Sequence, residues 1–506
     1  MLDATRKDLT LGIVGTGLMG RGIAQIAAQG GVQVRLFDSR AHAAEEARSA
    51  IAEALGRLVD KGKLSSANLD ATLTRIATVD NLAQLADCHI VLEAIVESLD
   101  AKRQLFHELE DVVAADCLLA TNTSSLSITA IAAGCRQPER VGGLHFFSPV
   151  PLMKVAEVID GVLSASWVGE ALATLVRRIG HTPVRAADTP GFIVNHAGRG
   201  YGTEALRIVG EGIADFAQVD RILRDSAGFR MGPFELFDLI GLDISYPVME
   251  SIYEQYYQEP RYRPSPIMRQ RIAAGLLGRK SGRGFYRYDN GAVVAVPATA
   301  APQVSVPPIW ISQRQPEAHA AVSALLQTLG ATLDHGARPS DNALCLVLPL
   351  GEDATTSTLA EKLDPSRTIA LDPLYLHGHR TLMQTPLTTP AVRDATWSLL
   401  ARDGTAVSVI HDSPGFVAQR VMAMIVNIGC DMAQQRIATP IDIDHAVTLG
   451  LGYPAGPLAL GDAIGAGTVL TILEALHTFY RDPRYRPSPW LIRRARLGVS
   501  LLTPEN

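Results

Sequence analysis

The sequence is short of cysteine and of clustered positive charge. Its five cysteines among 506 residues are scattered and form no CxxC pair, which predicts reduced thiols rather than a disulfide framework or a metal site. They are Cys88, Cys117, Cys135, Cys345 and Cys430. The formal net charge is −6, and no stretch is dense in lysine or arginine. The chain therefore has no electrostatic field suited to nucleic acid or to an anionic membrane surface.

Long apolar runs are also absent. None approaches the roughly 20 residues of a membrane-spanning helix, and the charged start Met1–Thr10 lacks the pattern of a signal peptide. We therefore expect a cytoplasmic protein with no membrane partner, no nucleic-acid partner and no metal. Hydrophobic residues make up 47% and charged residues 19%, so this length should fold into several packed units with little disorder.

Strand-like and helix-like patterns alternate in the first third of the chain. The expected strands are Leu11–Val14, Val32–Phe37, His89–Glu93, Leu118–Thr121 and Val141–His145, and the clearest helices are Gly20–Gln29 and Glu45–Val59. This alternation indicates a parallel sheet with helices on both faces. From Gly191 to about Leu277 the pattern is helical, and Asn290–Pro308 is expected to be a linker.

The second half of the chain repeats part of the first. The matching positions are Asp188–Phe192 with Asp412–Phe416, Asp220 with Asp444, Gly232 with Gly456, and Arg261–Pro266 with Arg484–Pro489. The helical domain is therefore duplicated. Between the copies, strand-like runs at Ala343–Leu348 and Thr368–Leu371 and a helix at Pro390–Ala401 suggest a shortened version of the end of the first domain.

A glycine-rich loop follows the first expected strand and opens the first helix. Its expected contacts with a dinucleotide are Gly15, Gly17, Leu18, Met19 and Gly20. The first glycine permits the tight turn, the second lets pyrophosphate approach the backbone, and the third lets helix and strand pack closely. Asp38 closes the next strand, where a carboxylate can bind ribose hydroxyls and repel the extra phosphate of NADP. The cofactor is therefore expected to be NAD, with NADP a minor alternative because Arg35 and Arg40 lie nearby.

These patterns predict four parts. An α/β Rossmann-type NAD-binding domain (1–187) is followed by an all-α domain (188–290), then by a degenerate Rossmann-like segment (300–409) and a second copy of the all-α domain (410–506). The degenerate segment has no glycine-rich loop, so we expect it not to bind a dinucleotide.

His145, at the end of an expected strand, is the candidate general base. Neutral histidine suits this role because its pKa lies near working pH, and the carboxyl ends of strands are where doubly wound sheets bind ligands. Glu157 stands twelve residues further on among apolar neighbours, and a buried carboxylate needs a partner. By itself this pair is more simply interpreted as a core histidine bonded to the backbone and a glutamate that faces the surface.

The motifs together resemble the 3-hydroxyacyl-CoA dehydrogenase family from about Leu11 to Tyr288. They are Gly15–Gly20, Val91–Glu97, Thr121–Ser125, His145–Pro149, Asp188–Asn195 and Gly278–Tyr286. The duplicated C-terminal part further resembles the long members of this family from phenylacetate catabolism, which act on 3-hydroxyadipyl-CoA.

This resemblance implies roles for individual residues. His145 would be the base, Glu157 its orienting partner, Asn195 a donor near the reacting oxygen, and Ser124 a residue between nicotinamide and substrate. Glu97, Lys102 and Lys280 would contact NAD, and Lys61 or Lys63 would meet the phosphates of the acyl-CoA thioester. The family usually has asparagine where this chain has Ser148, so the hold on nicotinamide is expected to differ. Arg199 is a candidate for binding the free end of a dicarboxylate substrate.

Other hypotheses about the function remain open at this point. The substrate could be the short-chain 3-hydroxybutyryl-CoA. A dehydrogenase of free β-hydroxy acids would instead need a lysine-centred site, for which no motif is present, and a crystallin-like structural protein could keep the fold and NAD without turnover. For the duplicated domain we expect Phe416–Leu502 to pack on Phe192–Leu277 as a mimic of a dimer within one chain, with further homo-oligomerisation left open.

Overall fold

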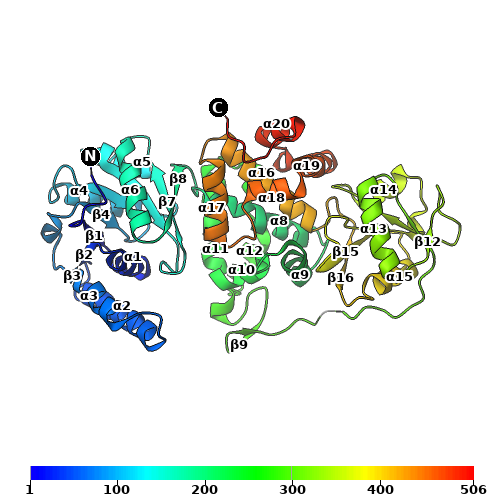
Figure 1. The fold of residues 1–506 in the computed structure, drawn as a ribbon, viewed down its shortest axis with the longest axis horizontal. Helices are drawn as coiled ribbons and strands as arrows, with labels where there is room; N and C mark the ends of the chain where they lie inside the picture. The colour runs from blue at the N-terminus through cyan, green and yellow to red at the C-terminus, as the bar shows by residue number, and fades with distance from the viewer. Residues whose placement is uncertain (1, 298, 506) are drawn as a thin grey trace. The chain divides into compact units, whose positions relative to one another are not determined.

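The computed structural model describes residues 2–297 and 299–505 (Figure 1), and the chain divides into two compact units. The first unit joins the chain up to His196 to a later segment, Gln435–Leu451, and the second joins Ala197–Gln434 to the stretch from Gly452 onwards. The division of the sequence into four parts stays a prediction. The two units are defined by contacts, and each is built from two stretches that lie apart in the sequence, so their bounds do not test the predicted ones.

An eight-stranded sheet forms the centre of the first unit, in the order β3-β2-β1-β4-β5-β6-β7-β8. The strands are β1 (Thr10–Val14), β2 (Gln33–Phe37), β3 (Ile76–Thr78), β4 (Ile90–Glu93), β5 (Leu118–Thr121), β6 (Val141–Phe146), β7 (Val155–Asp160) and β8 (Thr182–Ala187). All neighbours are parallel except β6 and β7. The order of the first six strands is that of a Rossmann fold, with the switch point between β1 and β4.

Helices connect these strands. They are α1 (Leu18–Gln29), α2 (Ala43–Asp60), α3 (Ser66–Thr74), α4 (Leu99–Glu110), α5 (Ile128–Ala132), α6 (Ser166–Arg178), α7 (Val194–Ala197) and, from the later segment, α17 (Pro440–Leu451). Apolar faces of α1, α2 and α6 pack with β1, β2 and β4 in one continuous core. The predicted parallel sheet, its five strands and its two helices are confirmed within a few residues.

Strands β3, β7 and β8 and helices α3, α4, α5 and α6 were not predicted. Strand β3 has three residues, too few for a visible alternation. The run Val155–Asp160 is buried along most of its length, so it shows no alternation of polar and apolar residues even though it is a strand.

The all-α part of the second unit contains helices from both copies of the repeat. They are α8 (Arg199–Gly210), α9 (Phe216–Ala227), α10 (Pro233–Ile240), α11 (Leu242–Gln255), α12 (Pro266–Ala273), α16 (Ala418–Gln434), α18 (Pro457–Ile464), α19 (Ala466–Tyr480) and α20 (Pro489–Leu497). The expected linker Asn290–Pro308 is partly wrong, because β10 (Ala292–Val293) pairs with β9 (Tyr288–Asp289) at its start. Its other described residues form no helix or strand.

A smaller sheet lies in the second unit, in the order β12-β11-β13-β14-β15-β16. Its strands are β11 (Ile309–Ile311), β12 (Leu333–Asp334), β13 (Leu344–Val347), β14 (Thr368–Leu371), β15 (His379–Gln384) and β16 (Ala406–His411), with helices α13 (Pro316–Thr328), α14 (Ala354–Ala360) and α15 (Pro390–Leu400). The series from β13 to β16 repeats the series from β5 to β8, including the single antiparallel pair. The predicted shortened copy of the first domain is confirmed, although four of its six strands were not predicted.

The repeated aspartates at the ends of the two sheets have the same structural role. Asp188 accepts hydrogen bonds from the backbone of Ile128 and Thr129 and so caps α5. Asp412 accepts hydrogen bonds from the backbone of Ala354 and Thr355 and so caps α14. A carboxylate at a helix N-terminus satisfies free amides and complements the helix dipole.

Each sheet is covered by a helix from the opposite copy of the repeat. In the first unit α17 packs on β7 and β8, and the amide of Ala187 donates to Ile437. In the second unit the matching helix α9 packs on β15, and the amide of His411 donates to Ile213. The two copies therefore exchange equivalent helices.

The repeat-related helices α8 and α16 pack against one another in the second unit through a buried ionic network. The guanidinium of Arg420, fully buried, donates to Glu204 at 2.8 Å and to Glu211 at 2.9 Å. Burial opposes ionisation of Glu204, but the charges of Arg484 and Arg420 outweigh it and lower the pKa of this carboxyl group. Removing one partner would leave an uncompensated buried charge, so the network ties the two copies together.

Among the described residues, no single helix is long and apolar enough to cross a membrane. The pair α18 and α19 reaches the required hydropathy only together, and it is bent by 95°. No group of three or more potential metal ligands is found in the part of the chain that the structure describes, and no disulfide joins the cysteines.

The buried His379 on β15 makes the second unit sensitive to acid. Its Nε2 lies 2.9 Å from Ser408 Oγ, and Asp225, Arg221 and Arg224 of α9 are the charged groups that act on it. Burial lowers the pKa of His379 to about 4 from an ordinary value of 6.5, an effect that Asp225 opposes and the two arginines reinforce.

The unfolded chain therefore binds the proton first, and stability is lost as the pH falls from 6.5 to about 4. Thermal unfolding of wild type and of His379→Val across this range measures the effect. The variant, which carries the residue found at Val155 in the first copy, is expected to lose less stability. Equal pH dependence of the two proteins would refute this assignment.

Candidate active site

His145 and Glu157 face each other across the antiparallel pair β6 and β7. They are direct partners in the register of the two strands, which explains how residues twelve positions apart meet. His145 Nδ1 lies 2.6 Å from Glu157 Oε2. His145 is 5% exposed and Glu157 is fully buried, so the pair is shielded from water.

The second oxygen of Glu157 is held by the backbone. Oε1 accepts hydrogen bonds from the amides of Ile193 and Val194, at 2.9 and 2.8 Å, where α7 begins. Both carboxylate oxygens are thus engaged, which fixes the plane of the group. Asn195 follows Val194 directly, so the same contacts place its backbone near the pair.

The imidazole of His145 is packed between aromatic rings. Its centroid lies 4.4 Å from that of Phe147 and 5.9 Å from that of Phe192. Within the described residues, only Nδ1 of this ring forms a hydrogen bond. A carboxylate at Nδ1 favours the tautomer that carries its proton there and leaves Nε2 as an acceptor. The arrangement is that of a general base oriented by a carboxylate.

The glycine loop between β1 and α1 has the geometry that a dinucleotide needs. Gly15 has φ +95°, and a side chain there would lie 2.5 Å from Ala94 O. A Cβ at Gly20 would lie 1.9 Å from Gly15 O, so strand and helix need glycine to pack. A Cβ at Gly17 would meet nothing within 4 Å. The space beside the start of α1 is therefore open where its free amides can bind a phosphate, and Leu18 and Met19 form the first turn.

Asp38 stands at the end of β2 and is held by the loop. Its Oδ2 accepts hydrogen bonds from the amide and hydroxyl of Thr16, and its Oδ1 from the amide of Arg40. Burial opposes ionisation of Asp38, but these hydrogen bonds outweigh it and lower its pKa. Arg35 is engaged by Asp87 and by Gln84 O, and the side chain of Arg40 pairs with Glu46.

Glu97 organises the loop after β5. Its Oε1 accepts hydrogen bonds from Thr123 Oγ1 at 2.6 Å, from the amide of Ser124 at 2.9 Å and from Ser125 Oγ at 2.9 Å. Burial opposes ionisation of Glu97, but Thr123 and the charge of Lys102 outweigh it, so its pKa lies below the usual range.

Lys102 lies beneath this loop and is 1% exposed. Its Nζ lies 2.5 Å from Glu93 Oε1 and 3.3 Å from Glu97 Oε2. The direct contact of Lys102 with NAD that the sequence suggested stays a prediction, and this burial favours an indirect role through Glu97. Glu93 was not predicted, although a charged residue ending an apolar strand is a visible signal.

A cavity of about 270 Å³ lies between α1, α2 and the segment Pro149–Pro151. Arg21 of α1 and Arg57 of α2 line it, and neither was predicted from the sequence. Lys61 and Lys63 follow the end of α2 and are exposed, outside the lining of this cavity.

Three further predicted residues are placed as follows. Ser148 precedes Pro149 through a cis peptide bond. Lys280 belongs to the second unit, where its Nζ lies 2.5 Å from Asp243 Oδ1. Arg199 begins α8 in the second unit, where burial lowers its pKa to about 10 against the influence of Tyr453.

The second copy lacks the catalytic pair. By the register of β14 and β15, Asp372 stands where the first copy has His145, and Thr381 where it has Glu157. Gln419, which matches Asn195, donates to Asp372 at 2.9 Å and so fills this position. Burial raises the pKa of Asp372 to about 6. The second copy therefore has no equivalent base.

A Rossmann sheet with an open glycine loop and a buried His–Glu pair defines a dinucleotide-dependent dehydrogenase. Comparison with known proteins makes this class specific. The NAD-binding domain of 3-hydroxyacyl-CoA dehydrogenase matches residues 10–189, and the C-terminal domain of the same enzymes matches twice, at 191–288 and 415–500.

The chain is 38% identical to 3-hydroxyadipyl-CoA dehydrogenase of Escherichia coli over 96% of its length and 98% of that protein. It is 40% identical to a probable 3-hydroxybutyryl-CoA dehydrogenase of Deinococcus radiodurans, covering 55% of this chain and all of the other. The crystal structure of 3-hydroxybutyryl-CoA dehydrogenase from E. coli superposes with a TM-score of 0.85 at 35% identity, over 97% of this chain and 99% of that one. The chain belongs to the 3-hydroxyacyl-CoA dehydrogenase family. It is an NAD-dependent oxidoreductase of 3-hydroxyacyl-CoA thioesters.

Proposed function

We propose that this chain oxidises the C3 hydroxyl of an (S)-3-hydroxyacyl-CoA with His145 as general base. His145 Nε2 takes the hydroxyl proton as the C3–H bond breaks, and the carboxylate of Glu157 stabilises the imidazolium that forms. The glycine loop and Asp38 would hold NAD, which would supply the acceptor for the C3 hydride, so that the products would be the 3-oxoacyl-CoA and NADH. The single observation that carries this proposal is the 2.6 Å contact of the buried pair with the opposite ring nitrogen left as an acceptor.

Neighbouring side chains position the reactants in this proposal. Asn195 donates to the reacting oxygen, and Ser124 separates nicotinamide from substrate. Ser148, with a shorter reach than an amide, contacts the nicotinamide side. Lys102 acts through Glu97, which holds the Ser124 loop, and Lys280 remains the candidate contact of the second unit with NAD.

We propose NAD rather than NADP because Asp38 is ionised and the nearby arginines are engaged by other groups. Asp38→Asn is expected to raise KM for NAD about tenfold and to reduce discrimination against NADP. The ratio of kcat/KM for the two cofactors measures this, with Asp60→Asn at the exposed end of α2 as control. An unchanged ratio would show that Asp38 does not select the cofactor.

We propose 3-hydroxyadipyl-CoA as the substrate, because the relative that matches nearly the whole chain carries that name. Arg199 is the proposed partner of the free carboxylate. It follows Asn195 by four residues and is half-buried, where a charge pair is stronger than in open water. The runner-up is 3-hydroxybutyryl-CoA, the substrate named for another relative.

A side-by-side measurement of kcat/KM with the two thioesters separates these substrates. A preference for the adipyl thioester that Arg199→Gln lowers supports the proposal. A preference for the butyryl thioester keeps the mechanism and replaces the substrate.

We propose that the CoA part lies along α1 and α2. The cavity lined by Arg21 and Arg57 lies between these helices, and Lys61 and Lys63 extend the positive charge beyond the end of α2. Positive side chains on adjacent turns suit the phosphates of CoA.

We propose that the duplicated helical domain replaces a partner subunit. The support is the exchange of α9 and α17 between the two sheets, together with the packing of α8 on α16. A chain truncated after Pro308 is expected to lose stability and activity, because removing α17 exposes the apolar faces of β7 and β8. Thermal unfolding and turnover of the truncated chain measure this. A stable, fully active monomer would refute the idea.

A further inference from the structure

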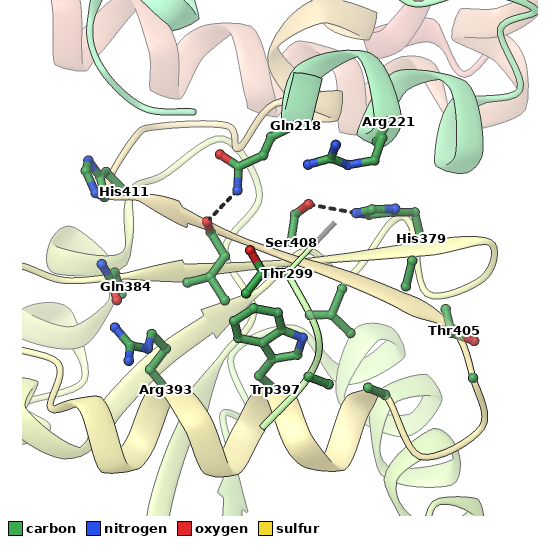
Figure 2. Close-up of a pocket in the computed structure, with 16 residues that line it drawn as sticks. Gln218, Arg221, Thr299, His379, Gln384, Arg393, Trp397, Thr405, Ser408 and His411 are labelled. Atoms are coloured by element: carbon green, nitrogen blue, oxygen red, sulfur yellow. Dashed lines mark hydrogen bonds between the residues drawn. The ribbon is translucent and has the colours of Figure 1, made fainter. Parts of the chain in front are cut away.

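A cavity of the second unit lies beside β16, the last strand of the smaller sheet. Its volume is about 500 Å³, in the range of pockets that bind small molecules. Figure 2 shows Arg393 and Trp397 projecting into it from α15, and Arg221 and Gln218 approaching from α9. His379 and Ser408 form part of the wall between them.

The lining of this pocket is basic. Its described residues include Arg221, Arg393 and His411 and no aspartate or glutamate, whereas His379 is neutral because burial lowers its pKa to about 4. Arg393 donates to the adjacent Asp394, whereas Arg221 forms no hydrogen bond or ion pair with the described residues. A concave surface lined by one sign of charge concentrates ions of the opposite sign.

A buried polar atom on the pocket wall also lacks a partner. His379 is 2% exposed, and its Nδ1 forms no hydrogen bond among the described residues, with Asp225 Oδ2 at 3.9 Å. Buried polar groups are normally hydrogen-bonded, and this atom lies within 4 Å of the carboxylate of Asp225 on α9. The indole of Trp397 adds a flat apolar surface and an N–H donor next to Arg393.

The matching positions in the first copy of the repeat carry different side chains from those that line this pocket. Matching positions follow from the equal strand registers and helix starts. In the first copy, the residues of this pocket correspond to the following: His379 to Val155, Ser408 to Val184, Trp397 to Ala173, Arg393 to Gly169, Gln384 to Asp160, Val409 to Arg185, and Arg221 to His445.

In the first copy the corresponding space is filled by an ion pair. Arg185 donates to Asp160 through Nε at 3.1 Å, and a Cβ at Gly169 would lie 2.3 Å from its guanidinium. In the second copy Val409 replaces this arginine and Gln384 replaces the acid. The space is thereby opened, and basic and aromatic side chains line it.

We propose that the α15 side of this pocket binds an organic anion that carries an aromatic ring, with Arg393 holding the anionic group and Trp397 the ring. Arginine matches carboxylate and phosphate geometry, and rings stack on indole. Both a nucleotide phosphate and an aryl carboxylate have this chemistry. The site is separate from the dehydrogenase reaction and needs none of its catalytic residues.

Calorimetric titration of the full chain tests the proposal, with NAD at saturation so that the glycine loop is blocked. AMP is the probe in one arm and benzoate in the other, with inorganic phosphate and acetate as ring-free probes. Saturable binding of AMP identifies a nucleotide, and binding of benzoate identifies an aryl acid. No binding of either at millimolar concentration, or equal binding of the ring-free probes, overturns the proposal.

Variants locate the binding. Arg393→Gln and Trp397→Leu are expected to weaken binding at least about tenfold, while Arg230→Gln, an exposed arginine outside the pocket, leaves it unchanged. The double variant Val409→Arg with Gln384→Asp restores the ion pair of the first copy and is expected to abolish binding. Thermal unfolding and dehydrogenase turnover, expected to match wild type, show that each variant is folded. Unchanged affinity in the folded double variant would overturn the assignment to this pocket.

Discussion

Replacing His145 by glutamine is expected to lower kcat by about 10²- to 10⁴-fold, the usual contribution of a general base. Glutamine keeps the approximate size of the side chain but cannot take the hydroxyl proton. The dissociation constant for NAD should change little, because the glycine loop and Asp38 do not contact His145. Steady-state kinetics with calorimetric NAD binding separate the two effects.

His107→Gln is the control for this variant, since His107 is an exposed histidine of α4. Its turnover is expected to match wild type. If His145→Gln retains near-normal kcat, the proton is taken by another group and the proposed mechanism is wrong.

Glu157→Gln is expected to lower kcat by about 10³- to 10⁴-fold, although in the proposed mechanism Glu157 acts through His145 and does not contact the substrate. The amide oxygen can still accept from Ile193 and Val194, so the amide nitrogen is left to donate to His145 Nδ1. Nδ1 must then be the acceptor, and the ring proton moves to Nε2. The base is thus held in the wrong tautomer.

Glu157→Asp distinguishes this effect from simple loss of structure. Aspartate keeps an acceptor at His145 but is shorter, so it disturbs the packing more than glutamine does. We expect the aspartate variant to be the more active of the two at saturating substrate, with KM and NAD affinity near wild type in both. If glutamine is tolerated and aspartate is not, Glu157 fills space and does not set the tautomer.

The fold was predicted best where a local pattern determines it. Alternation of strands and helices located β1, β2, β4, β5 and β6, and repeated motifs located the second helical domain. Strand β7 was missed because a strand buried on both faces reads like any other apolar run. Without β7, the antiparallel register that places Glu157 opposite His145 could not be predicted. The roles of the two residues were therefore inferred from the resemblance to the family.

The exchange of α9 and α17 illustrates a second limit. The repeat predicts that the two copies associate, but which helix covers which sheet depends on contacts far apart in the sequence, such as Ala187 with Ile437. The pocket beside β16 was missed for a similar reason. Arg221, Trp397 and His379 come from three separate elements and form no motif.

The most direct test of the account is NADH formation by the purified full chain with NAD, supplied in parallel with 3-hydroxyacyl-CoA thioesters and with the corresponding free 3-hydroxy acids. The account predicts turnover of thioesters, abolished in His145→Gln, and none of the free acids. Turnover of the free acids alone would indicate a different dehydrogenase. No turnover of either, in folded protein that binds NAD, would indicate a non-catalytic structural protein and contradict the account.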